Sequence, residues 1–202
     1  RGRFLRGQPW EEGEELLPEV AVPDIRPALE ATDEEGARGI LERARQAGLG
    51  EEADKAAWEW YEATDDKRSG FRLLLAIGSK HTRAAAKLLL DGDAEDNVAV
   101  ASYYCSVFPA TRLWADKLCT SVHTQVREAA ADAAKECGTR SHLATLLQLC
   151  GDQEQGVRRS AYISFREIEP RADGAGYDPD APTEQALKAL AALVEGPQAA
   201  VK

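Results

Sequence analysis

Hydrophobic and polar residues recur along most of this chain with the period of an α-helix. From residue 32 onwards, apolar positions lie three or four residues apart, and each stretch ends at glycine, proline or a short polar turn. No sustained alternation of β-branched residues occurs, so the pattern predicts no strands. The predicted helices cover residues 32–47, 51–63, 71–77, 81–90, 98–108, 110–119, 126–136, 141–150, 157–168 and 183–195.

One helical segment repeats itself. Residues 126–131 (VREAAA) recur as 157–162 (VRRSAY) and more faintly as 98–103 (VAVASY), with offsets of 157 − 126 = 31 and 126 − 98 = 28. Self-similarity at this period is typical of a solenoid, in which one helical pair cannot bury its apolar face without a neighbour. We therefore expect the first valine of each copy to face the seam between stacked pairs: Val98, Val126 and Val157.

The same pattern divides the chain into three parts. Residues 1–31 contain four prolines and predict an irregular N-terminal arm, and residues 32–168 form the helical repeats. Residues 169–202 predict a loop and a capping helix that starts at Thr183 and ends at Gly196. The sequence has no methionine, even at position 1, which is expected of a processed or trimmed chain, or of a fragment of a larger scaffold.

Composition narrows the expected partners. The formal net charge of −10 disfavours nucleic acid and anionic membranes and suits a basic protein partner. No apolar run in this sequence is long enough to span a membrane, and we expect no secretory signal because no apolar run follows the charged residues at the start. The four cysteines form no CxxC pair and have no metal-ligand spacing with histidine, so we expect no cofactor, no metal and a reducing, cytoplasmic setting. They are Cys105, Cys119, Cys137 and Cys150.

The repeated residues resemble a known family. Residues 126–134, and Gly151-Asp152 followed by 157–161, resemble HEAT repeats, and the short period is similar to the bacterial type of phycobilin-lyase-like proteins. The resemblance covers roughly residues 69–168, with 32–63 as a degenerate extra pair. It implies an all-α, right-handed superhelix of antiparallel helix pairs. HEAT proteins are mostly scaffolds that present a curved surface to other proteins, and the resemblance implies the same role here.

Aromatic and acidic residues mark the surface expected to bind a partner. Three aromatic residues at 58, 60 and 61 cannot all face one helical seam, so at least one should be exposed beside acidic residues. We expect a non-enzymatic interaction scaffold that binds a basic protein partner through one acidic, aromatic face. An immunity protein or a regulatory protein would act in this way. The expected contacts are Trp58, Trp60, Tyr61, Asp65, Asp66, Asp93, Glu95 and Asp96.

Other residue groups support alternatives. Trp114 and Asp116 invite comparison with HEAT-like alkyl-purine DNA glycosylases, since chemistry on a flipped base needs aromatic surface and a nearby carboxylate. The charge and the missing family motifs argue against that enzyme. A chromophore-lyase-like accessory protein is a further alternative, by analogy with the short repeats. The resemblance implies that the arginines after the repeat valines, Arg127 and Arg158, pair with an acidic group of the preceding turn. Asp93 and Asp152 are the candidate acids for such inter-repeat ladders.

Overall fold

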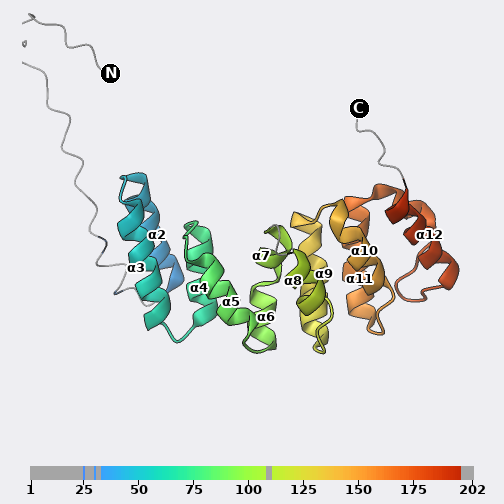
Figure 1. Ribbon diagram of the computed structural model, residues 1–202, viewed down its shortest axis with the longest axis horizontal. Helices are drawn as coiled ribbons and strands as arrows, with labels where there is room; N and C mark the ends of the chain where they lie inside the picture. Colours follow the sequence, from blue (N-terminus) through green and yellow to red (C-terminus); the bar gives the residue numbers. More distant parts are fainter. Residues whose placement is uncertain (1–24, 26–29, 31–32, 108–110, 197–202) are drawn as a thin grey trace, which may run out of the picture.

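The computed structural model describes residues 25, 30, 33–107 and 111–196. Its helices lie side by side in one elongated row, from α2 (Glu34–Gln46) at one end to α12 (Glu184–Glu195) at the other (Figure 1). Nearly all of the arm predicted over residues 1–31 lies outside the described residues.

Every regular element within the described ranges is helical. Three further helices follow α2 before a region of short helical segments, and two 14-residue helices lie beyond that region. The elements between the ends are α3 (Gly50–Ala63), α4 (Lys67–Ala76), α5 (Thr82–Leu90), α6 (Ala94–Ala99), α7 (Ala101–Ser106), α8 (Thr111–Leu113), the π-helical turn η1 (Trp114–Leu118), α9 (Thr124–Cys137), η2 (Arg140–His142), α10 (Leu143–Cys150), α11 (Gln155–Ile168) and η3 (Pro170–Ala175).

Neighbouring helices along the row share a continuous core. α2 packs on α3 and α4, α7 on α9, and α11 on both α9 and α10. Large side chains such as Leu41, Phe71 and Phe165 are fully buried in these seams. The predicted all-α stack of helix pairs is confirmed, and the right-handed twist of the superhelix stays a prediction.

The repeat valines were assigned correctly in two copies of three. Val126 and Val157 are completely buried, as expected. The expectation for Val98 is wrong, because this residue is 37 % exposed and Val100 occupies the core instead. The sequence alignment of this copy was out of register. Asp93 caps α6, so Asn97 is the fourth residue of that helix, and the fourth residue of α9 is Arg127.

With this register the repeat becomes nearly regular. Asn97, Arg127 and Arg158 occupy equivalent positions, with offsets of 127 − 97 = 30 and 158 − 127 = 31. Each donates hydrogen bonds to backbone carbonyls of the turn before its own helix, at 2.7 Å for Asn97 to Asp93 and 2.8 Å for Arg127 to Ser121. Arg158 does the same to the carbonyl of Asp152. The recurring side chain therefore satisfies carbonyl groups that a turn between helices leaves unpaired.

The inter-repeat ion pairs run in one direction. Arg127 bonds Asp152 of the following turn through both carboxylate oxygens, with both side chains nearly buried. The predicted ladder is confirmed only in part, because Asp152 pairs with the arginine before its turn and not with the one after it. Arg158 forms no ion pair with any described residue and bonds carbonyl groups instead. Asp93 also pairs with an arginine of the preceding repeat. For Asp93 that arginine is Arg68, at 3.8 Å.

Several helix boundaries differ from the predicted ones because acidic caps set them. The first helix begins at Glu34, since the side chain of Asp33 accepts from the Gly36 amide at 2.7 Å, and the predicted cap, Thr32, lies outside the described residues. The helix predicted over 98–108 begins earlier, at Ala94, and divides into α6 and α7 at Val100.

The C-terminal helix, α12, begins after Thr183 and ends before Gly196, as predicted. Thr183 accepts from the Ala186 amide at 3.2 Å, and α12 buries Ala186 and Leu190 against the row. Beneath it lies Glu169, a buried carboxylate held by Arg171 and Arg140. These hydrogen bonds, from Arg171 above all, lower the pKa of Glu169 to about 2.

Candidate binding surface

The aromatic trio on α3 divides between core and surface. Trp60 and Tyr61 are only 6 % and 3 % exposed, so they serve the core and are not available as contacts. Trp58 is half-buried and stacks on Tyr61, with ring centroids 5.1 Å apart, and lies 5.0 Å from the ring of His81. The expectation that at least one of the three is partly exposed is confirmed, and that residue is Trp58.

A buried carboxylate lies close to Trp58, and sequence reasoning missed it. Asp54 has a side chain only 8 % exposed, and its Oδ1 has no hydrogen-bond partner among the described residues. Its Oδ2 lies 3.7 Å from Lys80 Nζ and 3.9 Å from His81 Nε2, within ion-pair range. The only signal in the sequence is an aspartate on the alanine-rich face of the predicted helix.

The acidic residues before α4 are partly occupied by helix capping. Asp66 caps α4, accepting from the Ser69 amide at 3.1 Å and the Ser69 hydroxyl at 2.6 Å. These bonds lower the pKa of Asp66. Asp65 is exposed.

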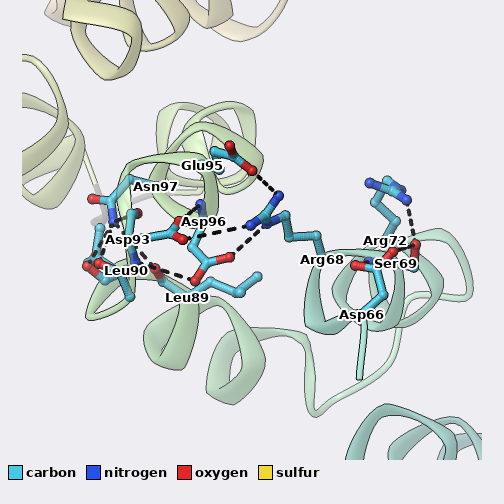
Figure 2. Close-up of polar contacts among 11 residues, drawn as sticks. Asp66, Arg68, Ser69, Arg72, Leu89, Leu90, Asp93, Glu95, Asp96 and Asn97 are labelled. Carbon is cyan, nitrogen blue, oxygen red and sulfur yellow. Dashed lines mark hydrogen bonds and ion pairs between the residues drawn. The ribbon is translucent and has the colours of Figure 1, made fainter. Parts of the chain in front are cut away.

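The acidic turn before α6 is gathered around one arginine. Figure 2 shows Arg68 of α4 reaching across to the start of α6, with Nε 2.8 Å from Asp96 and Nη1 2.5 Å from Glu95. Asp93 and Asp96 also form a reciprocal cap with each other's backbone amides. The three acids predicted as partner contacts therefore hold α4 against α6, and Arg68 offsets part of their negative charge.

The residues proposed for base chemistry are not arranged for it. Trp114 is fully buried, and its Nε1 donates to the Ala130 carbonyl at 2.9 Å, which leaves no ring face for a flipped base. Asp116 is exposed and lies 3.9 Å from Arg112. Trp114 instead packs edge-to-face on buried His142, whose Nδ1 accepts from the Thr139 amide. Across the described residues, no cluster of potential metal ligands occurs.

A cleft of about 650 Å³ opens between α5, α7 and the α8–η1 segment, and it was not expected from the sequence. Its apolar part includes the half-buried ring of Tyr103, which makes edge contacts with Phe71 and Tyr104. Leu113, on the opposite side, is 40 % exposed. The cleft is lined by Lys80, Arg83, Ala84, Lys87, Leu90, Asp91, Tyr103, Tyr104, Val107, Leu113 and Lys117.

Positive charge predominates in this cleft, although the chain as a whole is strongly acidic. Lys117 lies 3.3 Å from Asp91, the one acidic group among the lining residues. Arg83 and Lys87 are exposed and form no ion pair with any described residue. Part of this could have been seen beforehand, since cations at 80, 83 and 87 fall on one side of a helix.

Comparison of the chain with models of protein families, with curated proteins and with solved structures gives no match. The HEAT-like resemblance accordingly stays a prediction from the sequence. No helix within the described ranges combines the length and apolar character required to cross a membrane.

Proposed function

We propose that this chain is a non-enzymatic protein-interaction scaffold whose partner docks in the cleft between α5, α7 and η1. One observation supports it above the others: the cleft combines an apolar floor with two exposed rim cations, Arg83 and Lys87, that form no ion pair with any residue the structure describes. Such a combination is typical of interface centres, where an apolar anchor is ringed by polar groups. The repeat residues, by contrast, are used for packing. The four free cysteines are compatible with a reducing, cytoplasmic setting.

Site-specific photo-crosslinking in the native host tests this function. A photoreactive amino acid replaces Leu113 in the cleft or, as a matched control, Ile163 on α11, because the two side chains are 40 % and 43 % exposed. We expect a specific protein adduct from position 113 and none from position 163. Equal adducts from both positions, or none from 113, would contradict docking in the cleft.

A basic partner remains a second candidate, and Asp54 is the specific observation that favours it. The Oδ1 of this buried carboxylate has no hydrogen-bond partner among the described residues, and the same helix, α3, carries Trp58 and the exposed acids Glu51 and Glu52. A lysine or arginine of a basic partner, such as an effector that an immunity protein neutralises, could contact the indole face of Trp58 there. A photoreactive residue at Glu59 tests this surface, because an adduct formed there and not at 113 would assign the partner to α3.

A further inference from the structure

We propose that the occupant of the cleft is an acidic segment of the partner protein, with an apolar side chain set between its carboxylates. This inference rests on the proposed function and specifies its partner. It differs from the partner expected from composition, because the local charge of the cleft is opposite to the net charge of the chain.

The cations of the cleft come from two elements and the turn before one of them. Arg83 and Lys87 lie four positions apart on α5, so their side chains are neighbours on one helical face, and Lys80 lies three positions before Arg83. Lys117 of η1 also lines the cleft, 3.3 Å from Asp91 at the end of α5. A segment seated in the cleft therefore meets cations at more than one position along its length. Carboxylates before and after a central residue of that segment match this arrangement.

Two of these cations are available without breaking an existing contact. Lys80 and Lys117 each have an acidic neighbour, at 3.7 and 3.3 Å, whereas Arg83 and Lys87 have none within the described part of the chain. The attraction between an exposed cation and an anionic ligand becomes stronger when the ligand also excludes water from the neighbouring apolar floor. Arg83 and Lys87 should therefore contribute most of the electrostatic selectivity.

The floor of the cleft is prepared for an apolar side chain. The Tyr103 ring is held by edge contacts at 5.8 Å to Phe71 and 5.3 Å to Tyr104, so it loses little freedom when a ligand covers it. Tyr104 is itself buried, and burial, the largest effect on its hydroxyl, raises its pKa. Leu113 and Val107 add to the apolar lining of the cleft. This floor accounts for the central apolar residue of the proposed ligand.

A protein segment fits these observations better than a nucleic acid does. A phosphate backbone needs a continuous basic track, but here Asp91 lies within the cleft and the acidic turn of Asp93, Glu95 and Asp96 follows it. Stacking of successive bases needs several open aromatic faces, whereas of the two tyrosines in the cleft only Tyr103 is partly accessible and Tyr104 is 4 % exposed. A segment with a few carboxylates requires neither feature.

Fluorescence anisotropy with three labelled probes tests the inference on the full chain. The probes are a short glutamate-rich peptide with one central tryptophan, the same peptide with every glutamate replaced by glutamine, and a thymidine oligonucleotide. The test variant carries Arg83→Glu and Lys87→Glu. Its matched control carries Arg45→Glu and Lys135→Glu, which change the net charge equally at exposed positions outside the cleft. Far-UV circular dichroism confirms that both variants are folded.

We expect the glutamate peptide to bind the unchanged chain and the control variant alike, and to bind the Arg83/Lys87 variant at least about tenfold more weakly. The glutamine peptide and the oligonucleotide should bind much less. The inference is overturned if the glutamate peptide does not bind, if both variants weaken it equally, or if the oligonucleotide binds in preference. If any of these results accompanies a specific adduct from position 113, the cleft is still the interface and only the acidic character of the partner is refuted.

Discussion

A nearly buried ion pair links Arg127 of α9 to Asp152 in the turn before α11, and its removal should lower the free energy of unfolding by about 3 kcal/mol. Arg127 Nε and Nη2 lie 2.8 and 3.0 Å from the two carboxylate oxygens of Asp152. The side chains are only 8 % and 11 % exposed. We choose Arg127→Met, because methionine preserves much of the apolar stem and removes only the charge and its donors.

Two losses set this magnitude. The substitution removes both charge-assisted hydrogen bonds from Asp152 and leaves its carboxylate with the Glu154 amide, at 2.9 Å. It also removes the donor to the Ser121 carbonyl, at 2.8 Å. Breaking a buried pair from one side costs roughly 3–5 kcal/mol, and the remaining exposure of Asp152 favours the lower end. Since such domains are stable by only about 5–15 kcal/mol, the loss should be readily measured.

Urea unfolding followed by far-UV circular dichroism provides the measurement, and the chain offers a matched control. Arg159 binds Asp180 with the same two-pronged geometry, at 2.8 and 2.9 Å, but these side chains are 54 % and 48 % exposed. We expect Arg159→Met to leave the unfolding curve almost unchanged, because solvent screens an exposed pair. Equal shifts for the two variants, or no shift for Arg127→Met, would refute the reasoning that burial determines the effect.

Three further predictions follow from buried groups. Burial raises the pKa of Cys150 to about 12, and Cys105 and Cys119 are similarly buried, so Ellman's reagent should react rapidly with half-buried Cys137 alone until urea exposes all four thiols. The pKa of Glu169 in the folded state lies below its ordinary value of 4.5, so the stability that its carboxylate contributes is lost as the pH falls from 4.5 towards 2. Urea unfolding at each pH should therefore show that Glu169→Gln is less stable than the unchanged chain at pH 7 and that its stability varies less between pH 4.5 and 2. Gly138→Ala should lower the melting temperature and cost about 2 kcal/mol, since a Cβ there would clash with the Ala134 carbonyl oxygen and lie 2.8 Å from Ile168 Cδ1. An unchanged melting temperature would contradict this close approach.

The fold was largely predictable because packing dictates the pattern that the sequence shows. Val126 and Val157 are buried in the seams between helices, where burial favours apolar side chains, so both appear in the same local context. The burial of Val98 was predicted wrongly because sequence similarity over a short segment does not determine where a helix begins. The capping box of Asp93 and Asp96 moves the start of α6 and makes Asn97 the counterpart of Arg127. Asparagine and arginine differ in size and charge, so their equivalence in the repeat became clear only from the hydrogen bonds that both donate to backbone carbonyls.

The candidate site was much less predictable, because its parts come from separate elements. Net charge describes the whole chain, and it concealed a local group of cations formed by α5 together with Lys117 of η1. Periodicity showed that Trp58, Trp60 and Tyr61 could not share one seam, but which of them stays accessible depends on the neighbouring helix that brings His81 against Trp58. The acidic turn was visible in sequence, whereas its arginine partner from another repeat was not.

Hydrogen exchange measured with and without the glutamate-rich peptide tests most directly the claim that the cleft receives an acidic segment. Burial of the cleft by the peptide should slow exchange in α5, α7 and η1 and leave α3 unchanged. Slower exchange confined to α3, or no change at a saturating peptide concentration, would contradict the claim.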